Sequence, residues 1–376
     1  MNKTLVFVIN VDWYFRLHWI DRAVYFKKQG YLVHIVTNFT DNSLKEELSS
    51  LGFICHHLPL QRKKINLFSE IQTIYYLKSI LGQINPSLIH CVTIKANIYS
   101  GLINRYVLKR PIVYGVTGLG AVFSSRLLKF ILLKKIVVSL YKRISGTKSK
   151  FIFENSEDLL LFEKAGVLKN NNGVVIKGAG IDLQRFLPSM PPCNRAVLFA
   201  ARLLKDKGLH ILIEAKDRLE KQGCSFVVNV AGIMDTDVSS AIPIGQIEKW
   251  AENGDINWLG NVKDMPSLIA NNDIVCLPTT YGEGVPRILI EAASCQRAIV
   301  TTDVAGCREI VSHGFNGLLA IPNDSESLAE CLKVLLENKD MLIQYGSNGR
   351  KKVEQEFSQE MVFKETLEVY LNLSEP

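Results

Sequence analysis

The feature that most constrains the fold is an alternation of short apolar runs with longer amphipathic stretches. Short apolar runs are typical of buried strands, and the stretches between them are typical of helices. Strands and helices in this order imply a parallel sheet with helices on both faces. The expected strands of the first half are Thr4–Ile9, Tyr31–Thr37, Phe53–Leu58, Leu88–Cys91, Pro111–Val116, Phe151–Glu154 and Val174–Lys177, with helices near 16–29, 41–50, 66–83, 94–107 and 126–144.

The same alternation restarts after a proline-containing segment at residues 186–192, where regular structure is disfavoured. We therefore predict an α/β protein of two Rossmann-like, doubly wound domains that face each other across a cleft, with ligands at the carboxyl ends of the strands. The domains are predicted at 1–180 and 181–358, with a C-terminal helix at 359–372 that returns to the first domain. The expected strands of the second half are Ala196–Ala200, Ser225–Val230, Ile256–Leu259, Ile274–Leu277, Ala298–Thr301 and Gly317–Ala320, with a helix near 208–222.

Cysteine usage and hydropathy favour a cytoplasmic protein. The eight cysteines are scattered, form no C-x-x-C pair and mostly lie in apolar runs, as small buried side chains do in a reducing compartment. No apolar run is long enough for a transmembrane helix, and the N-terminal segment lacks the pattern of a signal peptide.

Charge is divided unevenly between the two halves. The first 180 residues carry 25 Lys and Arg against 10 Asp and Glu, whereas the remainder carries 19 against 27. Between residues 101 and 150 there are 11 basic residues and no acidic one. This asymmetry favours a polyanionic partner for the first half, either a lipid headgroup layer or a nucleic acid.

The most informative motif places two glutamates eight residues apart, after the strand that ends at Leu277. Glu283 stands at the mouth of a loop that leads into a helix through Gly284 and Pro286, and Glu291 lies about two turns further on. The free amides at the start of such a helix bind phosphate, and an acidic residue further along can reach the vicinal hydroxyls of a sugar. The alternative is that Glu283 only caps the helix and Glu291 lies on a solvated face.

A second motif follows the strand that ends at Ala200. Arg202 and Lys207 are five residues apart in the loop from strand to helix, and Gly208 allows the chain to turn. Two such cations can bind both ends of a diphosphate, arginine in a bidentate manner and lysine as a point charge. By itself the pair could equally be solvated, but both motifs follow strands of the same half.

Together the two motifs resemble the retaining glycosyltransferases of family 4, which have the GT-B fold. Further matching segments follow in the family's order: Gly178–Asp182, Trp258–Val262, Ala305–Val311 and Asn316–Leu319. The resemblance implies a nucleotide-diphosphate sugar on the second domain, with Glu291 on the ribose, Arg202 and Lys207 on the diphosphate, and Glu283 on the donor sugar. The implied donor-binding residues are Arg202, Lys207, Leu259, Gly284, Val285, Pro286, Arg287, Ile288 and Glu291.

The first half resembles, within that family, the enzymes that build bacterial O-antigens and capsules. The segment 10–18 is similar to their N-terminal opening, and the segment 116–123 is similar to their glycine loop. In this chain Trp19 replaces the usual arginine after His18, and Arg16 stands earlier, which leaves the role of that arginine unassigned. A plain turn is the alternative for the glycine loop. The implied acceptor or phosphate loop residues are Asp12, Trp13, Thr117, Gly118, Leu119 and Gly120.

The resemblance implies retention of anomeric configuration and a polyprenyl-diphosphate-linked saccharide as acceptor. The expected donor carries a hexose or N-acetylhexosamine on UDP, with GDP as the second choice. We expect same-face displacement in which the leaving diphosphate helps to accept the proton, with electrostatic stabilisation by the cations and the helix start. The expected catalytic residues are Glu283, Arg202, Lys207 and His18.

No metal or other cofactor is expected. Asp235-Thr236-Asp237 has the spacing of a manganese motif, but Arg202 and Lys207 already supply positive charge for the diphosphate. The adjacent pair His56-His57 would point to opposite sides of a strand and is therefore a poor chelate.

The stretch 125–143 mixes aliphatic residues with six cations and no acid, which favours a helix lying on anionic lipid. Its expected lipid contacts are Arg126, Lys129, Lys134 and Lys135. An ordinary core helix with a basic edge is the alternative. We thus expect a cytoplasmic enzyme held peripherally at the inner face of the cell membrane.

Two competing functions are a UDP-sugar 2-epimerase of the same architecture and a basic nucleic-acid-binding module. The basic helix interleaves aliphatic side chains and not stacking aromatic ones, which argues against nucleic acid.

Overall fold

The chain forms two compact α/β units in a computed structural model. The structure describes residues 3–60, 67–120, 123, 128–234, 240–281 and 283–374. One unit comprises residues 1–179 with 360–376, and the other comprises residues 180–359. The chain passes from the first unit to the second between residues 179 and 180, one residue before the predicted boundary. The C-terminal helix belongs to the first unit.

A fully parallel seven-stranded sheet forms the centre of the first unit. Its order is β3-β2-β1-β4-β5-β6-β7, so the direction of strand addition reverses between β1 and β4. The strands are β1 (Lys3–Ile9), β2 (Tyr31–Thr37), β3 (Ile54–His57), β4 (Leu88–Val92), β5 (Ile112–Val116), β6 (Ser149–Phe153) and β7 (Gly173–Val175).

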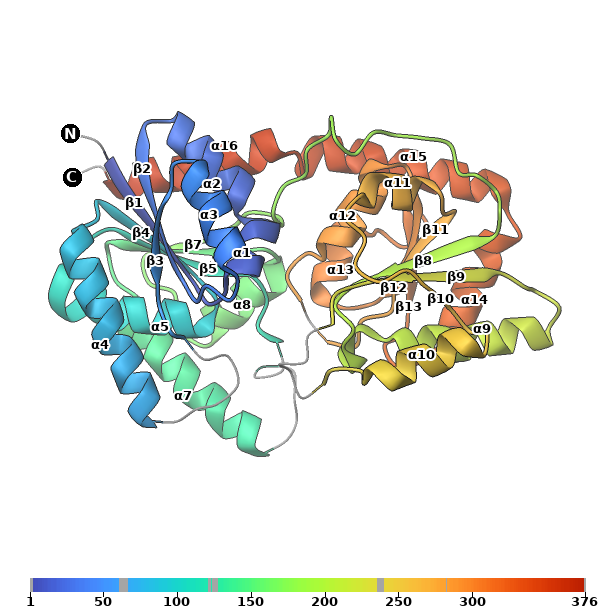
Figure 1. The fold of residues 1–376 in the computed structure, drawn as a ribbon, viewed down its shortest axis with the longest axis horizontal. Coiled ribbons are helices and arrows are strands. Elements are labelled where there is room, and N and C mark those ends of the chain that lie inside the picture. Colours follow the sequence, from blue (N-terminus) through green and yellow to red (C-terminus); the bar gives the residue numbers. More distant parts are fainter. Residues whose placement is uncertain are drawn as a thin grey trace. The chain divides into compact units, whose positions relative to one another are not determined.

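Strand β1 shows why both faces of this sheet are covered. Leu5 and Phe7 point into one apolar cluster and Val6 and Val8 into the other, as a period of two requires. The first cluster is covered by α1 (Asp12–His18), α2 (Ile20–Lys28), α3 (Asn42–Ser50) and α16 (Gln359–Ser374). The second is covered by α4 (Leu67–Ile84), α5 (Ile94–Ile103), α7 (Leu128–Ile144) and α8 (Ser156–Lys164), and α4 and α7 lie on the side of the sheet away from α16 (Figure 1).

The second unit has a parallel six-stranded sheet of order β10-β9-β8-β11-β12-β13, which reverses between β8 and β11. Its strands are β8 (Ala196–Ala200), β9 (Val227–Ala231), β10 (Asn257–Trp258), β11 (Ile274–Leu277), β12 (Ala298–Thr302) and β13 (Gly317–Ala320). Its helices are α9 (Leu209–Lys221), α10 (Ile244–Glu252), α11 (Met265–Ala270), α12 (Arg287–Ser294), α13 (Ala305–Ile310), α14 (Ser325–Leu336) and α15 (Lys339–Glu356), with a 3₁₀ turn at Lys205–Lys207.

Two predicted helices differ from the structure. The stretch 16–29 is two helices, which begin earlier and are separated at Trp19. The helix predicted at 94–107 is α only to Ile103 and continues as a π-helix over Asn104–Leu108. Within the described ranges, no helix combines the length and apolar character that a membrane span needs.

Candidate active site

The carboxyl ends of β8 and β11 bring the two predicted motifs of the second unit together. These adjacent strands flank the point where the strand order reverses, which is where open α/β sheets bind ligands. Arg202 and Lys207 follow β8, and Glu283 follows β11. Gly208 has φ +80, and a Cβ there would lie 2.0 Å from the carbonyl oxygen of Pro278. Glycine is therefore required where the two loops approach each other.

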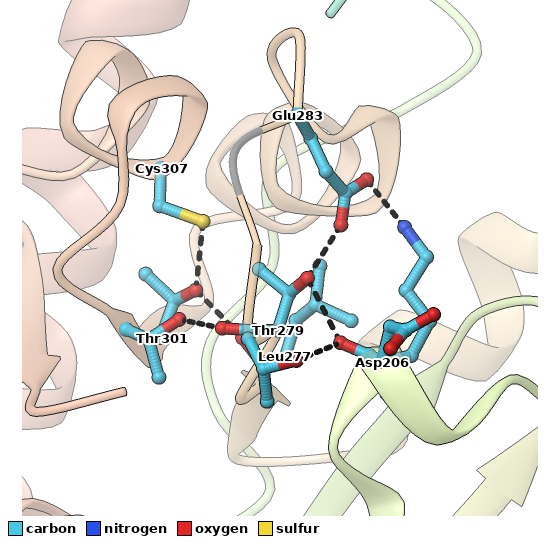
Figure 2. Close-up of polar contacts among 9 residues, drawn as sticks. Asp206, Leu277, Thr279, Glu283, Thr301 and Cys307 are labelled. Atoms are coloured by element: carbon cyan, nitrogen blue, oxygen red, sulfur yellow. Dashed lines mark hydrogen bonds and ion pairs between the residues drawn. The ribbon is translucent and has the colours of Figure 1, made fainter. Parts of the chain in front are cut away.

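Both carboxylate oxygens of Glu283 accept from neighbouring side chains. Lys207 Nζ forms an ion pair with Oε2, and the Thr279 hydroxyl donates to Oε1 at 2.6 Å. Figure 2 shows Glu283 pointing toward Thr279, with Asp206 beside them. Glu283 therefore does not cap the helix, because the N-cap of α12 is Pro286 and no side chain caps it. The structure thus joins residues 76 positions apart in a single ion pair.

Two threonines at the end of β12 donate hydrogen bonds to the backbone at the start of the same loop. Thr302 donates its hydroxyl to the carbonyl of Thr279, and Thr301 donates to the carbonyl of Leu277 at 2.7 Å. The Thr301 hydroxyl also lies 3.1 Å from the sulfur of Cys307 (Figure 2). Because all three threonines are buried, these contacts tie the end of β11 to β12 at several points.

Glu291 lies on α12 and is only 7% exposed, so the alternative of a solvated face residue is wrong. Its carboxylate accepts from Arg287 Nε at 2.8 Å, one helical turn earlier. Burial raises the pKa of Glu291, and the positive charge of Arg287 lowers it in part. The side chain is thus a largely desolvated acceptor whose negative charge is opposed by Arg287 and, more weakly, by Arg185.

The other predicted donor-binding residues lie after β8, after β10 and in the stretch that leads into α12. Gly284, Val285, Pro286 and Ile288 are buried in the loop and the first turn of α12, and Leu259 is exposed at the end of β10. Arg202 is partly buried, and its charge acts on the nearby Tyr281. The ring of Tyr281 lies 5.7 Å from Lys207 Nζ. Burial, followed by the negative charge of Glu283, raises the pKa of the Tyr281 phenol.

In the first unit, Asp12 has a local structural task. Its carboxylate accepts from the backbone of Trp13, from Asp41 N at 3.1 Å, and from both the backbone (2.7 Å) and the hydroxyl (2.9 Å) of Thr40. The side chain is fully buried. Asp12 therefore joins the loop after β1 to the loop after β2, while the neighbouring Trp13 ring packs on that of Tyr14 at 6.0 Å.

Tyr14 contacts both His18 and the loop after β5. Its hydroxyl donates to Thr117 Oγ1 at 3.0 Å, and its ring lies 4.5 Å from that of His18. Gly118 and Gly120 have φ +106 and +57, so the loop after β5 has the backbone that glycine favours. Leu119 between them is buried. His18 and the glycine loop thus belong to one cluster at the carboxyl ends of β1 and β5.

Two arginines near His18 lie in different surroundings. Arg16 is exposed and pairs with Glu47 of α3 at 3.0 Å, away from this cluster. Arg22 is buried instead, 4.3 Å over the Trp19 ring, and donates to the carbonyls of Gly178 and Ala179. Burial lowers the pKa of the Arg22 guanidinium.

The expected lipid contacts are only partly described. Arg126 lies outside the described residues, and Lys129 falls within α7. Lys134 lies 5.2 Å over the Phe123 ring, and Lys135 is exposed. The pair Asp235 and Asp237 also lies outside the described residues, and among those described no three His, Cys, Asp or Glu side chains group as metal ligands do.

Thr279, Tyr14 and Tyr281 were not predicted from the sequence. Thr279 follows directly on a buried strand that leads into a charged loop, and this position could have identified it. Tyr14 lies inside the segment 10–18, but nothing in its spacing indicates contact with Thr117, which is 103 residues away.

Two family models match the chain. The model described as glycosyl transferases group 1 matches residues 184–352, and the model described as glycosyl transferase 4-like matches residues 4–155. Together they cover most of both units, including the Lys207–Glu283 pair. The chain is a glycosyltransferase. Each of the two family models falls within one unit, the 4-like model in the first unit and the group 1 model in the second.

Two curated bacterial proteins are similar to this glycosyltransferase over most of their length. One is the N,N'-diacetylbacillosaminyl-diphospho-undecaprenol alpha-1,3-N-acetylgalactosaminyltransferase of Campylobacter jejuni, 28% identical over 81% of this chain and 82% of that protein. The other is the capsular polysaccharide biosynthesis glycosyltransferase CapM of Staphylococcus aureus, 26% identical over 92% of this chain and 91% of that protein.

Among solved structures, Anabaena HepE in complex with UDP and glucose aligns with a TM-score of 0.77 and 21% identity. The alignment covers 97% of this glycosyltransferase and 98% of that chain. At this identity the likeness shows the fold, and the fold is GT-B, as the sequence predicted.

Proposed function

We propose that this glycosyltransferase transfers a hexose or N-acetylhexosamine from a UDP-sugar to a polyprenyl-diphosphate-linked saccharide during assembly of an O-antigen or related surface polysaccharide. The names of the relatives support this choice, since one acts on an undecaprenol diphosphate saccharide and the other serves capsule biosynthesis. The HepE crystal held UDP and glucose, which supports UDP ahead of GDP.

The observation that carries the proposal is the Lys207–Glu283 pair at the reversal point of the second sheet. An ammonium and a carboxylate that neutralise each other without a donor can separate when one arrives. Lys207 then turns to the diphosphate together with Arg202, and Glu283 accepts a hydrogen bond from a sugar hydroxyl. Glu291 on α12 takes the ribose hydroxyls.

The reaction proceeds with retention and draws mainly on electrostatic stabilisation. Negative charge develops on the leaving diphosphate, and the cations of Arg202 and Lys207 oppose it, together with the amides at the start of α12. The diphosphate helps to accept the proton of the acceptor hydroxyl. His18, whose ring packs on Tyr14, orients that hydroxyl.

We also propose that the first unit lies on the inner face of the cell membrane. Helix α7 exposes an apolar stripe at i, i+4 and i+8: Leu128, Leu132 and Ile136 are 84%, 63% and 49% exposed. The exposed Lys135 borders the stripe. Helix α4 packs on α5, as α7 does, and lies on the same side of the sheet as α7 (Figure 1). It exposes Phe68, Ile71 and Tyr75. Apolar side chains beside cations are what a headgroup layer binds.

The test of the proposed function begins with thermal stabilisation of the purified enzyme by a panel of UDP- and GDP-sugars. The donor that stabilises most is then supplied with an undecaprenyl-diphosphate-linked saccharide, and transfer is followed by mass spectrometry. We expect sugar addition to the lipid-linked acceptor, and release of a 2-epimer without any acceptor would contradict the proposal. The family match already favours transfer over epimerisation.

Metal independence is tested in the same assay with EDTA. We expect turnover to be unchanged, because the cations of the site neutralise the diphosphate. A loss of activity that manganese restores would contradict metal independence and would favour Asp235 and Asp237 as metal ligands.

A further inference from the structure

The Thr279 hydroxyl lies between the two motif loops of the donor site, within reach of Glu283 in its own loop and of the Asp206 carbonyl in the other. Its single proton is directed to Glu283 Oε1 at 2.6 Å, within the range of a hydroxyl bonded to a carboxylate, whereas the Asp206 carbonyl is 3.3 Å away. The Asp206 carbonyl has its own donors in Thr280, the backbone N–H at 2.8 Å and the hydroxyl at 3.2 Å. Thr279 is therefore the partner of Glu283.

The backbone around Thr279 leaves that hydroxyl little freedom to turn away. Thr279 is fully buried, its carbonyl accepts from Thr302, and the strand end before it accepts from Thr301 (Figure 2). Threonine is also β-branched, so its χ1 rotamer is restricted. The donor to Oε1 is thus fixed to the sheet, whereas the donor to Oε2 is the end of a long lysine side chain.

This difference matters when a donor binds. If Lys207 leaves Glu283 for a diphosphate, Oε2 loses that ion pair and can accept a hydrogen bond from a sugar hydroxyl. The orientation of the carboxylate then depends more strongly on its hydrogen bond with Thr279. The hydrogen bond at Oε1 keeps the carboxylate in the same orientation through the exchange.

We infer that Thr279 is a positioning residue, whose hydroxyl holds Glu283 toward the donor sugar while Lys207 moves to the diphosphate. This inference rests on the proposed function, because it assigns the sugar to Glu283 and the diphosphate to Lys207. It predicts that Thr279 affects recognition of the sugar and leaves recognition of the nucleotide unchanged.

The experiment compares Thr279→Val, Thr279→Ser and Thr280→Val. Valine has the shape of threonine without the hydroxyl, and serine keeps the hydroxyl. Thr280→Val removes a neighbouring hydroxyl that bonds to Asp206, whose carbonyl still has the backbone N–H. For each variant we measure the affinity for UDP alone, and kcat and KM with the UDP-sugar that stabilises the wild type most.

For Thr279→Val we expect kcat/KM with the UDP-sugar to fall roughly 10-fold to 100-fold, as for a lost hydrogen bond to a charged group. Affinity for UDP should stay within about 2-fold, since UDP lacks the sugar. Thr279→Ser and Thr280→Val should behave like the wild type. In a Glu283→Ala background, Thr279→Val should have little further effect on affinity for the UDP-sugar, because contacting residues are not additive.

Equal losses of UDP and UDP-sugar binding in Thr279→Val would overturn the inference, since they would mean general loosening of the two loops. Serine as damaging as valine would overturn it as well, because the methyl group would then be the important part. If no nucleotide sugar bound the wild type, the proposed function itself would fail, and this result is distinct from a wild type that works beside an unaffected Thr279→Val.

Discussion

Glu283 and Glu291 stand eight residues apart and are held in different ways. Glu283 is bonded to Lys207 in the loop after β8 and to Thr279 in its own loop, whereas Glu291 is bonded to Arg287 on its own helix. Burial raises the pKa of Glu291 although a cation is adjacent. Its ionised form is therefore less favoured than that of an exposed glutamate, and this gives its ligand binding a dependence on pH.

We predict that affinity for UDP falls as the pH is lowered through the raised pKa of Glu291. A carboxylate accepts hydrogen bonds from ribose hydroxyls on both oxygens, and protonation removes part of that capacity. Because the pKa is raised, the loss begins at higher pH than an ordinary glutamate would give. Calorimetric titration of UDP between pH 8 and pH 5 measures this.

Glu291→Gln is the matched control, because it cannot titrate. UDP phosphate protonation affects both proteins, so the difference between them reports Glu291. Parallel curves for the two proteins would remove Glu291 from the ribose site.

Arg202→Ala should keep the fold and weaken UDP binding by roughly 10-fold to 100-fold, the loss of one charge-assisted contact. Turnover should fall at least as much, because the contact strengthens as charge develops on the diphosphate. Binding of UDP is measured by calorimetry and folding by circular dichroism. The exposed Lys205→Ala is the comparison, and it should bind UDP normally.

At the level of elements, the donor loop is shaped by the helix that packs against it. A Cβ on Gly306 of α13 would lie 1.7 Å from the carbonyl oxygen of Gly284 and 2.6 Å from that of Glu283. Contacts this short with backbone cannot be relieved by a side-chain rotation. The position of the loop therefore depends on the absence of a side chain at residue 306.

Gly306→Ala should displace the loop, lower the free energy of unfolding by about 1–3 kcal/mol, and weaken binding of the UDP-sugar. Gly245→Ala in α10 is the control, because a Cβ there meets nothing within 4 Å and alanine favours a helix. Chemical denaturation gives the stability of both variants. Normal donor binding by a folded Gly306→Ala would show that the loop tolerates the shift.

The elements also show where sequence reasoning succeeds and where it stops. Strands such as β2, β8 and β11 were predicted to the residue, because a buried parallel strand is a short apolar run between polar ends. Helix breaks were missed, since Trp19 and Asn104 carry no breaker signal. Short helices such as α11 and α13 give too few turns for a periodic pattern.

The sequence predicted a set of charged residues for the donor site but not the contacts between them. Glu283, Glu291, Arg202 and Lys207 were predicted from their spacing around the glycines and the proline of two loops that follow buried strands. Thr279 was missed because threonine is common at strand ends, and its role appears only once Glu283 and Lys207 are seen on either side of it. Lys207 and Glu283 meet because β8 and β11 are neighbours where the strand order reverses. A single sequence does not show the order of strands in a sheet.

At the scale of the whole molecule, the uneven charge and the apolar stripe of α7 belong to the same unit. The first half carries the excess of cations, and the second half has an excess of acids. Helix α7 exposes Leu128, Leu132 and Ile136 within the acid-free stretch 101–150. A bilayer of anionic lipid would attract this unit through charge and retain it through apolar contact.

We therefore predict that reversing Arg126, Lys129, Lys134 and Lys135 to Glu releases the enzyme from phosphatidylglycerol vesicles in a flotation assay. Each basic residue near an anionic surface contributes about 1 kcal/mol, so four reversals remove most of the attraction. The matched control reverses four exposed lysines of the second unit, Lys249, Lys263, Lys339 and Lys351, for the same change in net charge.

The control should still bind the vesicles, whereas loss of binding by both variants would mean that net charge alone governs attachment. The α7 variant should also lose turnover on a polyprenyl-linked acceptor far more than on a short-chain soluble analogue, because its donor site is intact. Raising the salt concentration from 0.1 M to 1 M should also release the wild type from the vesicles, since the Debye length falls from about 10 Å to about 3 Å. Equal vesicle binding by the α7 variant and the wild type at low salt would assign the helix to the ordinary core and leave the acceptor to be reached by other surfaces.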